Sequence, residues 1–190
     1  MVVTDDKQII MNMKILISFI VFLCCVTDIC AQSNLYKENK QIQGDGYTYQ
    51  CKVIGIIAEL YNTNQQFVEK DQINRNTGEY SSIKDSYTPQ FESDTWTRPK
   101  CYSIVSNAFS EAEKQRLRGV RLQISLYIHP DTGKVIDVSF AFSNRDNFAT
   151  IPISVYRKME LELKKNIWFT PTEHGKQFNY ILLWWSQEVT

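Results

Sequence analysis

The sequence predicts an α+β domain in which an antiparallel sheet has one or two helices packed on it. In two segments, 120–128 and 135–142, apolar side chains alternate with period two. Successive side chains of a strand point to opposite faces, so each segment is expected to be a strand with one more apolar face. The turn Pro130-Asp131-Thr132-Gly133 joins them, because Pro fixes φ and Gly tolerates positive φ. Together these features predict a β-hairpin.

A helix is predicted after the hairpin. Between Ile153 and Lys165, the residues Tyr156, Met159 and Leu163 recur at helical spacing. The charged residues between them, Glu160 included, are assigned to the solvent-facing side. This amphipathic pattern predicts that the helix packs its apolar side on the sheet.

A shorter helix is predicted before the hairpin. Ser110 and Glu113 form a capping box, in which each side chain can bond the backbone amide of the other. The helix is expected to run through about Leu117, and Gly119 can end it in the left-handed conformation. The preceding segment 101–109 is apolar, and the sequence leaves its type open.

The rest of the chain supplies further strands and one irregular segment. Residues 47–61 predict a strand because β-branched residues dominate there. Residues 62–97 are polar with interspersed aromatic side chains, so we expect irregular surface structure with one short strand pair. Further on, we expect a short strand at 167–169, a turn at 170–176 and the last strand at 177–189.

The last predicted strand is apolar on both faces. Such a strand is either covered on both sides or pairs with a partner. One face would hold Phe178, Tyr180, Leu182 and Trp184, and the other Ile181, Leu183 and Trp185.

The start of the chain has the pattern of a secretory signal peptide, assigned to residues 1–31. A lysine precedes an apolar run over 15–26, and Ala31 is the small residue before the expected cut. Translation could also begin at Met11 or Met13. A retained membrane anchor and a lipid-modified cysteine are the alternatives, although a membrane span needs about 20 apolar residues.

Removal of the signal would leave a lead-in and one domain. We expect residues 32–46 to be flexible and residues 47–190 to form a single α+β domain. The protein would be secreted across the inner membrane to the periplasm or cell surface, with no transmembrane segment in the mature chain. Lys plus Arg and Asp plus Glu number 21 each. This balance gives no electrostatic reason to expect a nucleic-acid partner.

Two cysteines, Cys51 and Cys101, remain after the expected cut. In an oxidising compartment they are candidates for a disulfide. The bridge would close a loop of about 50 residues and stabilise the fold by roughly 4 kcal/mol in the loop-entropy model. The alternative is two buried free thiols, which are common in cores.

The C-terminal half, about residues 110–190, resembles the C-terminal domain of TonB. The similarity lies in the order helix, strand, turn, strand, helix, aromatic segment, Gly turn and final strand. It implies that the domain pairs a partner's extended segment with a sheet edge, the mode called β-augmentation. TonB also has a membrane anchor and a Pro-rich spacer, whereas residues 32–46 contain no Pro. The matching residues are Gly119-Val120, Asp131-Thr132-Gly133-Lys134-Val135, Ile167-Trp168-Phe169-Thr170-Pro171 and Gly175.

The whole chain also looks like uncharacterised secreted proteins of Bacteroidetes. That resemblance agrees with the Ala31-Gln32 junction and implies no particular activity.

The sequence contains no recognisable catalytic constellation. A Ser or Cys nucleophile needs a positioned base, but the two histidines, His129 and His174, are expected in separate turns. Two histidines without ligands at suitable spacing do not form a zinc site, and no cofactor is expected. Glu160 and Glu162 are expected to point to different helix faces and to be solvated. The sequence therefore predicts that the protein is not an enzyme.

The leading hypothesis is a secreted, non-enzymatic domain that binds an envelope protein, or a second copy of itself, through its last strand. Among the tryptophans, Trp168 and Trp184 are assigned to the core, and Trp96 and Trp185 to the surface. A glycan-binding module that uses Trp96 and an enzyme of unrecognised type are the alternatives. The candidate interaction surface consists of Phe178, Tyr180, Ile181, Leu183, Trp185 and Trp96.

Overall fold

The computed structural model describes residues 34–82, 85 and 87–190 of the chain. Within them, six strands form one sheet in the order β1-β2-β3-β5-β4-β6, and each neighbouring pair is antiparallel. The strands are β1 (Lys40–Gly44), β2 (Tyr47–Ile54), β3 (Ile57–Asn62), β4 (Arg121–Ile128), β5 (Val135–Ser143) and β6 (Ile181–Glu188). The helices described are α3 (Thr97–Ser106), α4 (Glu111–Arg116) and α5 (Ile153–Asn166), with 3₁₀ turns η1 (Asn147–Thr150) and η2 (Gly175–Gln177).

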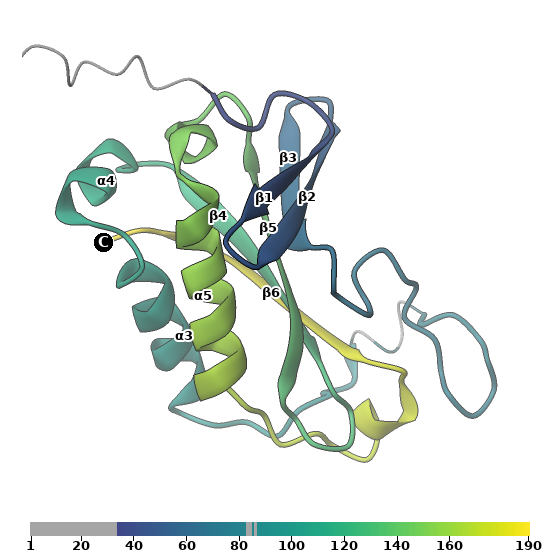
Figure 1. Cartoon of the computed structure of the whole chain (residues 1–190). Helices are drawn as coiled ribbons and strands as arrows, with labels where there is room; N and C mark the ends of the chain where they lie inside the picture. The colour runs from purple at the N-terminus through teal and green to yellow at the C-terminus, as the bar shows by residue number, and fades with distance from the viewer. Residues whose placement is uncertain (1–33, 83–84, 86) are drawn as a thin grey trace, which may run out of the picture. The chain divides into compact units, whose positions relative to one another are not determined.

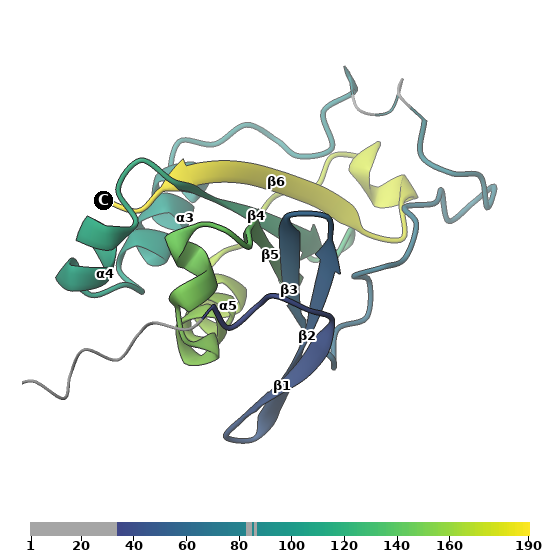
Figure 2. The ribbon, with the colours of Figure 1, turned by 90° about the horizontal axis from the view of Figure 1, so that it is seen from above.

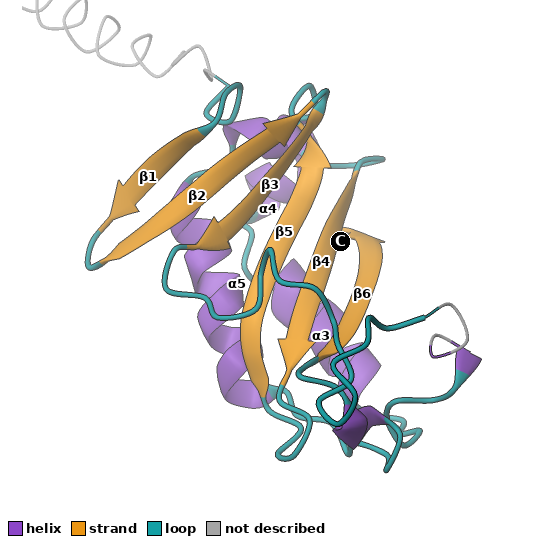
Figure 3. Cartoon of the chain, turned by 90° about the vertical axis from the view of Figure 1, so that its right-hand side faces the viewer, coloured by secondary structure: helices purple, strands orange, loops and turns teal. Residues whose placement is uncertain are grey.

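The helices and the connection from β3 to α3 lie on opposite faces of the sheet. Figure 1 shows α5 along the sheet with α3 beside it. In Figure 3 the helices lie behind the strands, and the connection crosses in front of them. Viewed from above in Figure 2, β1 and β6 form the two ends of the sheet. The predicted α+β fold with an antiparallel sheet is therefore confirmed.

The central hairpin is confirmed, with one difference in which side chains face the core. β4 and β5 pair as predicted, and Gly133 in their turn has a φ of 69°. A register shift after Tyr127 places Ile128 opposite Val135, and both are buried in the core. The strict alternation expected along β5 therefore holds only after this irregularity.

The N-terminal part contains more sheet than the sequence predicted. Residues 47–61 are two strands, β2 and β3, because Gly55 adopts a φ of 62° in a turn between them. The prediction of a flexible lead-in at 32–46 is wrong for residues 34–46, whereas residues 32 and 33 lie outside the described residues. β1 pairs along β2, and Tyr36 is fully buried, with its hydroxyl donating to the Ile151 carbonyl at 2.7 Å.

The helices before and after the hairpin are confirmed, and the segment of open type is a helix. Ser110 and Glu113 form the predicted capping box of α4, and Gly119 follows with a φ of 79°. α3 takes up most of the apolar segment, and α5 has the predicted bounds within one residue. Glu160 does not face solvent, however: it is 1 % exposed and contacts Tyr49 of β2 and Asn62 of β3.

The C-terminal part is less regular than predicted. Residues 167–169 form no strand; the chain there makes isolated bridges, Lys134 with Trp168 and Phe91 with Pro171. The last strand is shorter than expected because η2 and three further residues, 178–180, precede it. Among the described residues of 63–96, Asp85 and Tyr87 are helical and the rest is irregular apart from isolated bridges. The short strand pair predicted there is reduced to a single bridge between Ile73 and Tyr80.

Two further predictions concern the membrane and the signal peptide. None of the helices in the described part of the chain is both long enough and apolar enough to span a bilayer. The predicted signal peptide, residues 1–31, lies outside the described residues.

Candidate functional site

The outer edge of β6 is the candidate site. In the described part of the chain, β6 pairs with β4 on one side and with no named strand on the other. A side chain donates to the backbone near each end of the strand: Gln72 Nε2 to the Tyr180 carbonyl at 2.8 Å, and the Arg121 guanidinium to the Ser186 carbonyl. The stretch between them, 181–185, is the part of the edge best placed to pair with an added strand.

Two neighbouring hollows follow this edge, and we call them together the β6 groove. Phe91, Leu183 and Trp184 line both of them, so the hollows are adjacent along the strand. The first has a volume of about 370 Å³, and its other lining residues are Gln72, Ser81, Asp85, Thr88, Pro89, Gln90 and Leu182. The second has a volume of about 360 Å³, and its other lining residues are Glu92, Ser93, Asp94, Thr97, Arg98, Cys101, Tyr102, Phe169 and Trp185.

The wall opposite β6 comes from the end of the β3–α3 connection and from α3. Figure 2 shows this connection passing beside β6 before it enters α3. The Phe91 ring packs on Phe169 with centroids 4.8 Å apart, and the Glu92 amide donates to the Thr170 carbonyl at 2.8 Å. Asp94 accepts from the amides of Trp96 and Thr97 at 3.0 and 2.7 Å, which fixes the chain at the start of α3.

The structure divides the predicted interaction residues into two groups. Phe178, Tyr180 and Ile181 are buried, so their side chains are part of the domain's own packing. Leu183 and Trp185 are half-buried and line the groove, where Trp185 stacks on Tyr102 with ring centroids 6.3 Å apart. These two residues are therefore the predicted strand residues that a partner could contact.

The predicted distribution of tryptophans is wrong in two places. Trp168 and Trp184, assigned to the core, are 54 % and 61 % exposed. Trp184 lies on the same face of β6 as the exposed Leu182, and it lines both hollows. Trp96 is exposed as predicted, but it packs on Trp168 with ring centroids 4.5 Å apart and does not line the groove. Trp185 is half-buried.

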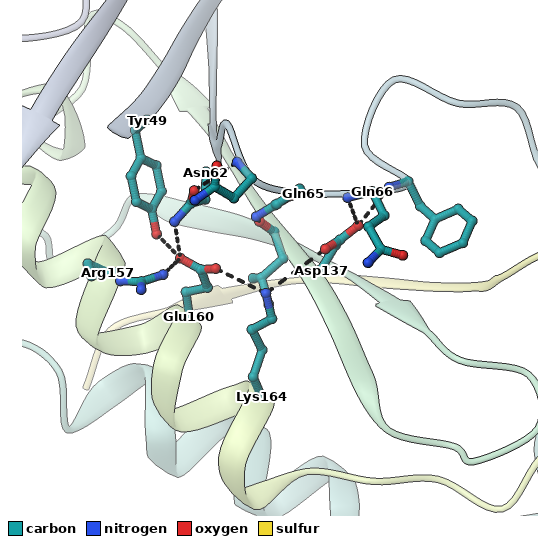
Figure 4. Close-up of polar contacts among 11 residues, drawn as sticks. Tyr49, Asn62, Gln65, Gln66, Asp137, Arg157, Glu160 and Lys164 are labelled. Carbon is teal, nitrogen blue, oxygen red and sulfur yellow. Dashed lines mark hydrogen bonds and ion pairs between the residues drawn. The ribbon is translucent and has the colours of Figure 1, made fainter. Parts of the chain in front are cut away.

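A cluster of charged and polar groups lies away from β6, where α5 packs on β2, β3 and β5 near the last residue of β3. Figure 4 shows the Glu160 carboxylate surrounded by Tyr49, Asn62, Arg157 and Lys164. Its Oε2 accepts from the Tyr49 hydroxyl and from Arg157 Nη1 at 2.7 Å, and its Oε1 accepts from Lys164 Nζ at 3.2 Å. We call these residues, with Asp137, the Glu160 cluster.

Asp137 extends the cluster to the opposite face of the sheet. One of its oxygens accepts from the backbone amides of Gln66 and Phe67, both at 2.7 Å, and the other lies 3.9 Å from Lys164 Nζ. Gln65 Nε2 donates to the Val138 carbonyl at 2.5 Å, next to the point where β3 stops pairing with β5. The cluster thus closes the edge of β5 that β3 leaves unpaired.

The electrostatics of the cluster keep Glu160 ionised. Burial alone would raise the pKa of this carboxyl group, but hydrogen bonds from Tyr49 and Arg157 and the charge of Lys164 outweigh burial, so the pKa is lowered. Burial and the neighbouring Glu160 charge raise the pKa of Tyr49 far above its ordinary value. Glu160 and Asp137 are 1 % and 2 % exposed, so a substrate has no access to them in this structure.

The histidines lie in separate turns, as predicted, and each has a carboxylate nearby. His129 Nδ1 is 3.9 Å from Asp131, and His174 Nε2 is 3.6 Å from Asp85. Asp85 already accepts from the Ser82 hydroxyl at 2.7 Å, while the His174 ring packs edge-on against Phe178. No nucleophile hydrogen-bonds to either ring in the described part of the chain, and no group of described residues there is suited to hold a metal ion.

Both cysteines are buried free thiols in the structure, which is the alternative to the predicted disulfide. Cys51 lies on β2, and Cys101 lies on α3 at the base of the groove. Burial raises the pKa of Cys51 to about 11 and that of Cys101 to about 12. Thiols with such pKa values are poor nucleophiles at neutral pH.

A third hollow, of about 420 Å³, lies on the sheet face away from the helices. Polar and small side chains line much of it, among them Lys52, Glu59, Gln123 and Ser143. It offers neither an unpaired strand edge nor an exposed aromatic ring. The β6 groove combines both features and is therefore the better candidate for binding.

Comparisons with known proteins agree on the family. Residues 32–185 match the family model described as "Domain of unknown function (DUF5043)". The crystal structure of a DUF5043 family protein from Bacteroides uniformis ATCC 8492, at 1.85 Å resolution, is similar to this chain with a TM-score of 0.76. The two sequences are 33 % identical, and the match covers 82 % of this chain and 94 % of that one. No curated protein matches the sequence.

Proposed function

We propose that this chain, which belongs to the DUF5043 family of domains of unknown function, is a secreted, non-enzymatic protein-interaction domain of the cell envelope. It binds an extended segment of a partner protein along the free edge of β6. The observation that supports this proposal is the β6 groove: an unpaired strand edge with exposed Trp184 and Leu182 beside two hollows.

The edge meets the physical needs of β-augmentation. Main-chain hydrogen bonds give affinity in this mode, and pockets for alternate side chains give specificity. Charged side chains and Pro usually protect an edge strand from pairing, and residues 178–187 contain neither. The resemblance of residues 110–190 to the TonB C-terminal domain points to the same mode of binding.

Capture of partners with a matched pair of variants tests the proposal. The domain, residues 32–190, is immobilised as wild type, Trp184→Lys or Trp168→Lys and exposed to solubilised envelope of its own organism. Both tryptophans are exposed, but only Trp184 lines the groove. We expect wild type and Trp168→Lys to capture a partner protein that Trp184→Lys does not capture. Equal retention by both variants would contradict binding at β6.

A second copy of the chain is the other possible partner. Sedimentation velocity of the isolated domain separates the two cases, because a β6-paired dimer would dissociate in Trp184→Lys. A wild-type monomer leaves the envelope protein as the partner.

Secretion is tested separately. The full chain is expressed in its organism, and the mature N-terminus is determined from the periplasmic and surface fractions. We expect it at Gln32, after the cut predicted at Ala31. If the chain is found in the cytoplasmic fraction with residues 15–26 still attached, an envelope role is excluded.

Glycan binding is a second candidate, supported by one observation. Trp96 and Trp168 are exposed and pack on each other with centroids 4.5 Å apart, and exposed indole faces can stack on sugar rings. Titration of tryptophan fluorescence against a panel of polysaccharides tests this candidate. A response that Trp168→Lys abolishes and Trp184→Lys retains would place the ligand on this pair.

A further inference from the structure

The charges around the β6 groove indicate what kind of segment it takes. We infer that the bound segment is extended, places apolar side chains in the two hollows and carries basic side chains beside them. This inference rests on the proposed function of the β6 edge and adds the chemistry of the partner.

The shape of the groove fits alternate side chains of one strand. Side chains on the same face of a strand recur about every 6.6 Å, and the two hollows are adjacent along β6. Each hollow has a volume of about 360–370 Å³, enough for one large apolar side chain. The base of the second hollow is apolar, with Cys101 3 % and Phe169 8 % exposed. An aromatic or branched apolar side chain is therefore the best occupant there.

The charged side chains of the groove are mostly acidic. Asp85 lines the first hollow, Glu92 and Asp94 line the second, and Arg98 is the one basic residue among the lining residues of both. The net charge of the lining is thus about −2 at neutral pH. β6 contributes no charge between its first residue and Gln187, so this wall decides which charge a bound segment can carry.

The two aspartates stay ionised in this setting. Hydrogen bonds from Ser82 hold the pKa of Asp85 below its ordinary value. Burial alone would raise the pKa of Asp94, but the hydroxyl and amide of Thr97 donate to its carboxylate and lower it. Both hydrogen-bond sets come from the domain itself, so the negative charges are present before a partner binds.

Arg98 is already counted in this net charge, and it does not pair with any of the three carboxylates. Its guanidinium lies 5.8 Å from the ring centroid of Tyr102, and no carboxylate in the described residues forms an ion pair with it. Trp184 adds a further attraction for cations, since its exposed indole face can accept an ammonium or guanidinium group. A basic segment is therefore favoured over an acidic one, while the apolar side chains fix its position.

A pair of synthetic peptides tests the inference on the domain 32–190. One ten-residue peptide alternates leucine with lysine and the other alternates leucine with glutamate, both with blocked ends. We expect the lysine peptide to bind about fivefold or more tightly by titration calorimetry at low salt, as a few exposed charge pairs would give. The ratio should shrink at 0.5 M NaCl because salt screens exposed charges.

Variants locate the effect. Glu92→Lys, on the groove wall, should narrow or reverse the preference, whereas Glu79→Lys, which is exposed and outside the groove, should leave it unchanged. Trp184→Lys should weaken both peptides. If the lysine peptide binds Trp184→Lys as tightly as wild type, it binds elsewhere and the inference is wrong.

The remaining outcomes separate the inference from the proposed function. Equal affinity for the two peptides would overturn the charge preference and leave β6 as a site for extended segments. Tighter binding of the glutamate peptide would overturn the inference in the same way. Binding of neither peptide would also overturn it, and the envelope capture with Trp184→Lys and Trp168→Lys would then decide whether β6 binds a partner at all.

Discussion

Near the last residue of β3 charged side chains lie inside the domain, whereas at β6 apolar side chains lie outside it. Glu160 and Asp137 are almost fully buried, and Arg157 and Lys164 offset their charge. On β6, whose outer edge pairs with no named strand in the described residues, Leu182 and Trp184 are exposed. Each arrangement has a cost in water, so each needs a compensating interaction.

The difference shows where the compensation comes from. The Glu160 cluster is satisfied within the domain, since hydroxyl, amide, guanidinium and ammonium groups all donate to its two carboxylates. Among the described residues, the β6 edge has such internal partners only near its two ends, in the side chains of Gln72 and Arg121. The cluster is therefore expected to serve stability, and the edge to serve binding.

The largest expected effect is on stability at the cluster. Glu160→Ala leaves the Tyr49 hydroxyl buried without its acceptor and Arg157 without its ion-pair partner, and Lys164 keeps only Asp137, 3.9 Å away. We expect a loss of about 3 kcal/mol in the free energy of unfolding, measured with urea. Glu162→Ala, two residues along the same helix and exposed, should cost less than about 0.5 kcal/mol. Equal costs would show that the cluster is not what holds this region together.

Acid should reveal the same cluster. The pKa of Glu160 is lower in the folded state than in the unfolded chain, so its stabilisation is present above the unfolded value, about 4.3, and is lost as pH falls through the folded value. Unfolding by urea, repeated from pH 6 down to pH 2.5, should show wild type losing more stability over this range than Glu160→Gln, which has no carboxyl group to protonate. Parallel pH profiles would contradict a depressed pKa at this site.

The sequence predicts most of the helices and strands, but it does not predict the difference between the Glu160 cluster and the β6 edge. The hairpin, α4 and α5 have local signals: alternation, a capping box and a helical repeat. Its charge predicts that Glu160 faces solvent, although Glu160 follows Tyr156 by four residues and so shares its face of the helix. Residues four apart lie on the same face of a helix, so this spacing predicts burial of Glu160 better than its charge predicts exposure.

The groove could not be predicted because its two walls are far apart in sequence. Residues 88–98 show only turn residues and scattered aromatics, and nothing local places them beside β6. The double apolar face of the last strand was a valid signal for an edge or covered strand, but it did not say which side chains the domain would cover. The sequence predicts a core position for Trp184 because tryptophan is highly buried on average, and only the sheet order leaves this side chain exposed.

A smaller effect is expected from removing an exposed ring at the groove. Trp184→Thr keeps a strand-forming residue at the edge and removes a side chain that is 61 % exposed. We expect the free energy of unfolding to change by less than about 1 kcal/mol, while partner binding is lost. A cost as large as that of Glu160→Ala would mean that Trp184 belongs to the domain's own packing, and the contrast between the cluster and the edge would fail.

The smallest expected effect is on the two buried thiols. Cys51 belongs to β2, and Cys101 lies at the base of the groove. Burial raises the pKa of Cys51 to about 11 and that of Cys101 to about 12, so neither should react appreciably with iodoacetamide at pH 7.5 while the domain is folded. After unfolding in urea, both should be alkylated to the same extent with and without reductant, as mass spectrometry would show. Alkylation that requires reductant would instead reveal the disulfide.

Faster labelling of Cys101 than of Cys51 in the folded domain would show that the groove opens more readily than the region closed by the Glu160 cluster. This is expected of a surface that must admit a partner.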